Sequence, residues 1–243
     1  MGYFQATGFY AENYGGFYLK WFELNGPRAM DVSVFSADIR DHDCELMAAS
    51  LSADCRLRLV GITHPRRRAQ FILGRVLLRH ALRGRFGAAA DGWRLDASRG
   101  KPRLVGVDAP EISLSHARHL VVCATARFDI GLDVEECRTR DFVALAAQIC
   151  PPLELARFLS LPIDERCVAF YRMWTLKEAI YKLHGGVVAP PEQIGLSSPE
   201  EAALRHVYFQ PEAGFLGAVV ACSSCPPRLI LHPLMPTELG LKR

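Results

Sequence analysis

The chain has 243 residues, which is enough for one large domain or two small ones with a hydrophobic core. Half of the residues are hydrophobic and 23% are charged, as in an ordinary soluble globular protein. A formal net charge of +3 is too small to indicate nucleic-acid binding by itself, and no apolar run approaches the length of about eighteen residues that a membrane span needs. We therefore expect a cytoplasmic protein that binds neither nucleic acid nor a membrane.

The eight cysteines are scattered without the spacing of a disulfide scaffold. Cys222 and Cys225 form the only C-x-x-C, and no second pair of cysteines or histidines with zinc-ligand spacing accompanies them. Because a structural zinc site needs four ligands, reduced thiols explain these residues better than a metal site does.

The N-terminal residues differ from the rest of the chain. Residues 1–29 are rich in Gly, Tyr and Phe and show no clear hydrophobic period, whereas Asp31–Phe35 alternate as in a strand. We therefore expect the folded domain to begin near Met30 and residues 1–29 to form an extension, whose composition does not decide whether it is ordered.

A helical pattern follows, and then strands. Ser52 can cap a first helix, and apolar residues after Pro65 mark one face of a longer, arginine-rich helix. Strands are expected around residues 93–95, 111–115 and 120–124, with a turn at 99–102.

The second part of the chain repeats this order of elements loosely. The patterns predict helices at residues 142–148, 153–159 and 166–183, and strands at 130–134, 194–196, 207–210 and 216–221. This succession predicts an α+β protein with two similar halves, residues 30–128 and 129–243, that meet near residue 128.

Two acidic residues stand out on the strand at 130–134 and just after it. Asp133 and Glu135 are two residues apart, so they point to one face while Val134 enters the core. Two carboxylates this close favour a hard cation such as Mg²⁺ between them. The alternative is a solvated strand edge with ion pairs to Arg138 and Arg140.

A third carboxylate lies on the helix at 166–183. Trp174, Glu178 and Lys182 share a side of this helix, and Lys177 lies beside Glu178. Because Lys182 follows Glu178 by one turn, we expect it to compensate that charge, so that the pKa of Glu178 need not rise. The alternative is an exposed Glu178–Lys182 salt bridge worth only a few tenths of a kcal/mol.

Other residues suit an anionic ligand. Ser115 and His116 end a strand and are directly adjacent, which is a poor geometry for a serine-hydrolase triad, and no G-x-S-x-G is present. A phosphate-contacting pair is at least as good an interpretation. The arginine run at 66–68 is either a solvated helix start or a phosphate site, because the guanidinium fork matches phosphate oxygens.

The order of these pieces resembles one enzyme family. The chain carries F-I-L-G-R at 71–75, G-K-P at 100–102, I-S-L-S-H at 112–116, G-L-D-V-E at 131–135 and W-T-L-K-E-A-I-Y-K at 174–182. In this order they resemble the 4′-phosphopantetheinyl transferases, specifically the broad-specificity monomeric type that activates peptide and polyketide synthetases. The resemblance covers residues from about Met30 to Ala221.

The resemblance implies a reaction and a fold. The family transfers 4′-phosphopantetheine from coenzyme A to a serine of an apo carrier protein and releases adenosine 3′,5′-bisphosphate. Its fold is a pseudo-two-fold pair of α+β halves with coenzyme A in the cleft between them. We therefore expect a monomer whose partners are coenzyme A and apo acyl or peptidyl carrier domains.

The resemblance also implies residue roles. Asp133, Glu135 and Glu178 would hold Mg²⁺ against the pyrophosphate, with Glu178 also the base for the incoming serine and Lys182 neutralising charge on the phosphate. The nucleotide phosphates would be bound by Lys101, Ser115, His116, Lys177 and one or more of three arginines (Arg58, Arg67 and Arg75). Several arginines compete for one role, so this choice stays open.

Two rival functions follow from the same residues. A single housekeeping substrate, the fatty-acid carrier protein, is the first, but the small synthases with only that role are about half as long. The second is a non-enzymatic arginine-rich protein that binds anions or nucleic acid. Such a protein needs aromatic residues among its basic ones, whereas the arginine-rich helix carries mainly aliphatic residues.

Overall fold

The computed structural model describes residues 31–97, 101–196, 204–222, 226–234 and 237–239. The expected extension at residues 1–29 lies outside the described residues. The described residues form a mixed four-stranded sheet, an antiparallel three-stranded sheet and a two-stranded hairpin, with helices packed against the two larger sheets, so the protein is α+β as predicted. None of the described helices is long and apolar enough to cross a membrane.

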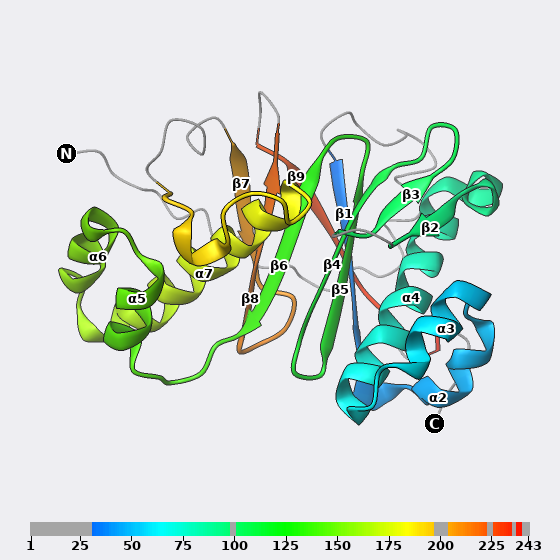
Figure 1. Cartoon of the computed structure of the whole chain (residues 1–243), viewed down its shortest axis with the longest axis horizontal. Helices are drawn as coiled ribbons and strands as arrows, with labels where there is room; N and C mark the ends of the chain where they lie inside the picture. The colour runs from blue at the N-terminus through cyan, green and yellow to red at the C-terminus, as the bar shows by residue number, and fades with distance from the viewer. Residues whose placement is uncertain (1–30, 98–100, 197–203, 223–225, 235–236, 240–243) are drawn as a thin grey trace.

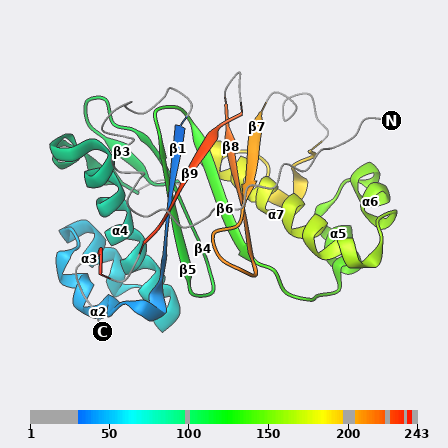
Figure 2. The same ribbon diagram turned by 180° about the vertical axis from the view of Figure 1, so that it is seen from behind.

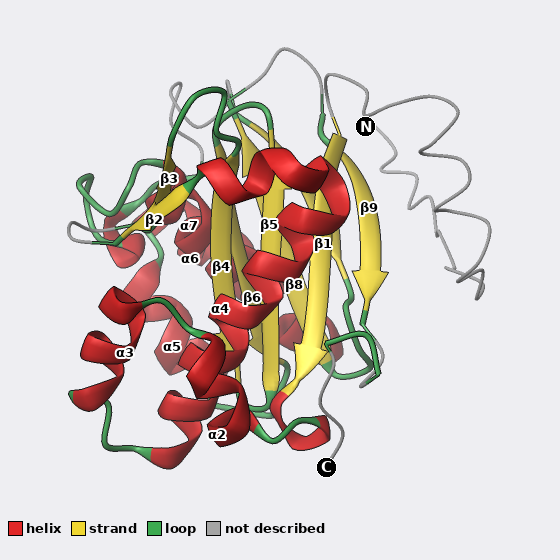
Figure 3. Ribbon diagram, turned by 90° about the vertical axis from the view of Figure 1, so that its right-hand side faces the viewer, coloured by secondary structure: helices red, strands yellow, loops and turns green. Residues whose placement is uncertain are grey.

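The first sheet has the strand order β4-β5-β1-β9. Its members are β1 (Asp31–Asp38), β4 (Glu111–Ala117), β5 (Leu120–Ala126) and β9 (Arg228–Pro233). The long helix α4 (Pro65–Phe86) packs across this sheet (Figure 3). Its Gly74 lies against β4 and β5, since a Cβ there would be 3.5 Å from Val121 Cγ1. The predicted helix after Pro65 is confirmed.

Smaller elements surround α4. They are α2 (Cys44–Met47), α3 (Ala53–Val60), the short hairpin of β2 (Arg94–Asp96) and β3 (Arg103–Val105), and the 3₁₀ helices Ile39–Asp41, Ala48–Ser50 and Gly87–Gly92. The predicted cap of α3 is confirmed, because the hydroxyl of Ser52 accepts a hydrogen bond from the Cys55 amide at 3.4 Å. Leu59 is the residue of α3 that enters the core.

The second sheet has the order β6-β8-β7. It contains β6 (Ile130–Glu136), β7 (Arg205–Phe209) and β8 (Phe215–Ala221), and α7 (Arg166–Leu183) lies on one of its faces (Figure 1). Helices α5 (Phe142–Ile149) and α6 (Pro152–Leu159) pack beside α7, with 3₁₀ helices at Ile163–Glu165 and Pro191–Gln193. The bounds predicted for α7 are confirmed.

The two sheets meet where β4 of the first lies beside β6 of the second (Figures 1 and 2). Serine hydroxyls join these strands. The Leu132 amide donates to Ser113 Oγ at 3.0 Å, and the Val134 amide donates to Ser115 Oγ at 3.3 Å. A cluster of buried apolar side chains from both sheets, including Val122 of β5 and Val219 of β8, packs into one core.

The structure departs from the expected elements in two places. Residues 194–196 form no strand, because the carbonyl of Ile194 accepts a hydrogen bond from a lysine instead of from a neighbouring strand. The strand β9 was not expected, and it pairs in parallel with β1 of the first sheet. The expected division at residue 128 therefore fails for this segment: residues 228–233 lie with the first half.

Candidate active site

The contact between β6 and α7 depends on Gly131. A Cβ at this position would lie 1.9 Å from the Ala179 carbonyl oxygen and 2.7 Å from the Leu183 amide nitrogen. Only glycine permits so close an approach of two backbones. This contact places Asp133, two residues along β6, beside the stretch of α7 that carries Glu178 and Lys182.

Asp133 lies at the centre of the cluster and is almost entirely buried. Its Oδ1 accepts hydrogen bonds from Lys182 Nζ at 2.6 Å and from the Ser115 hydroxyl at 2.8 Å. Its Oδ2 is also buried but accepts no hydrogen bond from the described part of the chain. A buried carboxylate oxygen without a partner costs free energy, so this atom calls for a cation or a donor.

The other two carboxylates share this environment. Burial and the neighbouring Asp133 raise the pKa of Glu135 to about 7, against a hydrogen bond from the Trp174 indole to Oε1 at 3.2 Å. Burial and Asp133 also raise the pKa of Glu178. Three acidic groups that repel each other in a partly buried place are the setting in which a bound cation stabilises most.

The rise in the pKa of Glu178 corrects an expectation from the sequence. We expected Lys182 to compensate the charge of Glu178 and leave its pKa unchanged. In the structure Lys182 pairs with Asp133, at 2.6 Å, and its attraction for Glu178 is outweighed by burial and by the Asp133 charge. Spacing along one helix could not show that a strand residue would take the lysine.

Ser115 contacts two members of the cluster directly. Its hydroxyl donates to Asp133, and accepts from the Val134 amide and from Lys182 Nζ at 3.1 Å. A hydroxyl has one hydrogen to donate and two lone pairs, so these three partners satisfy it fully. Ser115 is therefore a member of the carboxylate cluster, and its contact with a phosphate stays a prediction.

Lys177 does not join the cluster either. Its side chain is fully buried on the far side of α7, where Nζ lies 3.0 Å from Glu154 Oε2. It donates to the carbonyls of Ile149, at 2.8 Å, and of Ile194. Because consecutive helical residues point about 100° apart, a residue next to Glu178 faces a different neighbour. The expectation that Lys177 contacts the nucleotide is thus contradicted by its position.

The remaining predicted phosphate ligands are spread over the first half. Arg67 of α4 contacts the ring of His116 on β4, and burial together with Arg67 lowers the pKa of His116 to about 4. Arg58 donates to the Ala97 carbonyl at 2.7 Å, and Lys101 donates to the Ile130 carbonyl at 2.6 Å. The structure brings Arg67 and His116 together but leaves these other two apart from them.

Arg75 is the least accessible of the three candidate arginines. It packs 4.7 Å from the ring centre of Phe71, its Nε is buried without a hydrogen-bond partner among the described residues, and burial lowers its pKa. It faces Cys55 and Arg58. An arginine in this position fits a structural role beside α3 as well as a ligand role.

Sequence reasoning gave no role to three residues that shape the site. The Trp174 indole orients Glu135, the Ser113 hydroxyl joins β4 to β6, and Gly131 sets the distance between β6 and α7. The G-x-D-x-E motif contains this glycine, but the backbone that excludes a side chain there lies on α7, at Ala179, 48 positions later. No local sequence pattern reveals that contact.

Comparisons with known proteins agree with this arrangement. The family model of the 4′-phosphopantetheinyl transferase superfamily matches residues 129–214, which include all three carboxylates. The chain is 36% identical over 164 residues to the 4′-phosphopantetheinyl transferase HetI of Nostoc sp., a match that covers 65% of this chain and 69% of HetI.

Other relatives match over shorter parts. The 4′-phosphopantetheinyl transferase psf-1 of Bacillus pumilus is 30% identical, over 52% of this chain and 53% of that protein. The 4′-phosphopantetheinyl transferase Sfp of Bacillus subtilis is 26% identical, over 49% of this chain and 54% of Sfp. The chain thus spans about half the length of these two relatives. With the longer match to HetI and the family model at the carboxylates, the chain belongs to the 4′-phosphopantetheinyl transferase superfamily.

Proposed function

We propose that the protein transfers 4′-phosphopantetheine from coenzyme A to a serine of apo carrier proteins, in a magnesium-dependent reaction that releases adenosine 3′,5′-bisphosphate. The observation that carries this proposal is the group of three carboxylates on β6 and α7 beside Lys182. The relatives' names supply the reaction class, and the site supplies groups that suit it.

The residues present fit a magnesium ion. Asp133, Glu135 and Glu178 offer oxygen ligands, the kind that Mg²⁺ prefers, and the buried Oδ2 of Asp133 has no hydrogen-bond donor among the described residues. Burial, and after it the charge of Asp133, raises the pKa of Glu135 and of Glu178, and a bound cation would offset both effects. When bound, the ion would neutralise charge on the pyrophosphate of coenzyme A.

The chain's own residues would do the rest. Glu178 would accept the proton of the carrier serine, and its raised pKa brings it closer to the operating pH, where a general base is most effective. Lys182, already paired with Asp133, would stabilise the charge that develops on the phosphate as the bond to the leaving oxygen breaks. No covalent intermediate with the protein is needed.

The first half would hold the nucleotide. We place coenzyme A in a cleft between two similar α+β halves, with the Arg67–His116 pair as its nearest phosphate ligand. Arginine keeps its charge at any working pH, so the neutral His116 would contribute a hydrogen bond and Arg67 the charge. We also propose that the protein acts as a monomer, since β6 and α7 of the same chain carry all three carboxylates, and that it acts in the cytoplasm.

The non-enzymatic alternative fits the structure less well. Several arginines of α4 already pair with acidic residues of the chain: Arg68 with Glu45 at 2.7 Å, and Arg83 with Asp91 at 2.7 Å. Arg85 donates to the Thr125 carbonyl at 3.0 Å. The arginine-rich α4 therefore uses these side chains to hold neighbouring segments, which reduces what it presents to an anionic polymer.

A transfer assay with matched variants tests the proposal. Purified protein is incubated with coenzyme A, Mg²⁺ and a panel of apo carrier domains, and the carriers are weighed by intact-mass spectrometry. We expect one carrier class to gain a phosphopantetheine group. Glu135→Gln should lose transfer, whereas the neighbouring Glu136→Gln should retain it, because Glu136 pairs with Arg118 and Arg138 away from the cluster. No mass gain on any carrier would contradict the proposal.

A further inference from the structure

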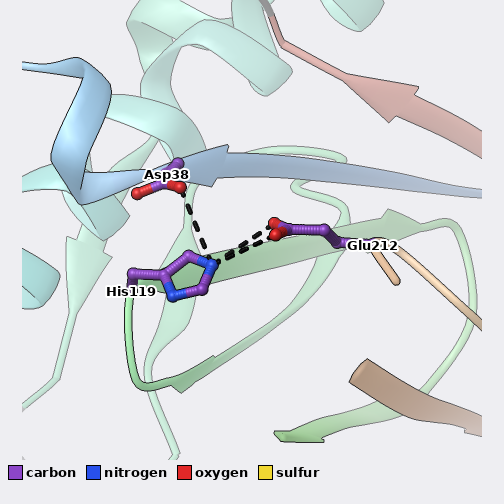
Figure 4. Close-up of side chains that lie close together, drawn as sticks. All are labelled: Asp38, His119 and Glu212. Carbon is purple, nitrogen blue, oxygen red and sulfur yellow. Dashed lines mark hydrogen bonds and ion pairs between the residues drawn. The ribbon is translucent and has the colours of Figure 1, made fainter. Parts of the chain in front are cut away.

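A second group of convergent side chains lies apart from the carboxylate cluster. Asp38 ends β1, His119 lies in the turn between β4 and β5, and Glu212 lies in the turn between β7 and β8. The two turns are at the same end of the molecule in Figure 1, and Figure 4 shows the three side chains pointing toward one another. The group therefore joins the first sheet to the second.

The distances between His119 and Glu212 match those between ligands of one metal ion, and Asp38 lies somewhat farther away. His119 Nε2 lies 3.3 Å and 3.4 Å from the two carboxylate oxygens of Glu212 and 3.7 Å from Asp38 Oδ2. One ligand atom from each residue lies within 4.8 Å of the others. In a tetrahedral site with bonds of about 2.0–2.1 Å, ligand atoms are roughly 3.3–3.4 Å apart.

The histidine and the aspartate are already held in place. The His119 ring packs edge-on against Phe215 with centroids 5.0 Å apart, and its backbone carbonyl accepts a hydrogen bond from the Ile39 amide at 2.9 Å. The side chains of His119 and Asp38 are each 12% exposed, whereas Glu212 is 40% exposed. Two fixed ligands and a third at the surface give an ion a way in without reordering the core.

The guanidinium group of Arg40 lies beside these three residues. Arg40 pairs with Asp38, and its Nη2 lies 3.9 Å from Glu212 Oε1. The Arg40 side chain is 61% exposed, so it can turn into solvent at little cost. Arg40 is thus the group with which an incoming metal ion must compete.

We propose that Asp38, His119 and Glu212 bind a divalent transition-metal ion of the zinc class, which ties the β7–β8 turn to the first sheet. An imidazole nitrogen with two carboxylates suits such an ion, whereas Mg²⁺ takes oxygen ligands alone. The three residues leave a fourth position to water. The site is separate from Asp133, Glu135 and Glu178, and it does not depend on the transfer reaction.

Zinc binding to the metal-stripped full chain tests the proposal by calorimetry and by thermal melting. A ligand at 100 times its Kd raises the melting temperature of a domain of this size by roughly 5–10 °C, and we expect a shift of this order with Zn²⁺. His119→Gln and the exposed Glu212→Gln should each weaken zinc binding at least 10-fold. Arg40→Ala should strengthen it, since it removes the competing cation. His206→Gln, at an exposed histidine of β7, is the matched control and should bind zinc as the wild type does.

Three outcomes would overturn the proposal. Zinc could raise the melting temperature of His119→Gln and of the wild type equally. Binding could disappear with Cys222→Ser, which would assign it to the exposed thiol of Cys222. Finally, Glu212→Gln could lower stability by the same amount with and without zinc, which would leave the three residues as an ion-pair network only.

Discussion

Replacing Gly131 with alanine perturbs the contact between β6 and α7 on which the site depends. The new Cβ would lie 1.9 Å from the Ala179 carbonyl oxygen, whereas ordinary contacts begin at 3.4 Å. The strand and helix must therefore separate by about 1.5 Å. Both atoms in conflict belong to backbone of regular elements, so we expect the upper end of overpacking costs, about 3 kcal/mol.

Urea unfolding and thermal melting measure this change. A loss of about 3 kcal/mol should lower the melting temperature by roughly 6–12 °C. The same separation moves Asp133 away from Glu178, so kcat should fall by about 100-fold in the molecules that remain folded.

Gly84→Ala is the matched control. Gly84 lies inside α4, and a Cβ there would meet no atom within 4 Å, so alanine should stabilise the helix by about 0.4–1 kcal/mol. If Gly131→Ala unfolds within about 0.5 kcal/mol of the wild type, the steric account of the G-x-D-x-E glycine is wrong.

Three further predictions concern single side chains. Lys177→Met should lower the free energy of unfolding in urea by about 3–5 kcal/mol, because it leaves Glu154 buried without its cation, and adding Glu154→Leu should recover much of that loss. A raised KM for coenzyme A at unchanged stability would contradict this structural role of Lys177. Glu178→Gln should lower kcat by about two to four orders of magnitude with little change in coenzyme A affinity, and a near-normal kcat would move the base elsewhere. His116 binds its proton more weakly in the folded state (pKa about 4) than in the unfolded state (6.5), so its contribution of up to about 3 kcal/mol to the free energy of unfolding should be lost as the pH falls from 6.5 to 4. His116→Gln should remove this part of the pH dependence, and an unchanged dependence would refute the lowered pKa of His116.

Much of the fold could be predicted because its signals are local. The bounds of α7 follow from its apolar spacing and from Gly185 after it, and the start of α3 follows from Ser52. Asp133 and Val134 take opposite sides of β6 as alternation requires, with Val134 in the core. These features depend on neighbours a few residues away, which the sequence shows directly.

The errors come from contacts between distant segments. The family resemblance assigned Lys177 to the ligand, but its partners are Glu154 and two carbonyls that only the folded chain brings near. The pairing of β9 with β1 joins segments nearly 200 residues apart, and no local pattern encodes it. The choice among the three arginines stayed open for the same reason, and Arg67 is the one that the fold places against His116.

Release of adenosine 3′,5′-bisphosphate tests the central claim most directly. The wild-type protein, coenzyme A and a carrier domain that gains mass are incubated with Mg²⁺ or with EDTA, and the nucleotide is measured by chromatography beside the carrier's mass. We predict one nucleotide released for each phosphopantetheine attached, no release in EDTA, and none from Asp133→Asn with Mg²⁺. Equal release from Asp133→Asn and the wild type would contradict the assignment of the carboxylate cluster as the active site.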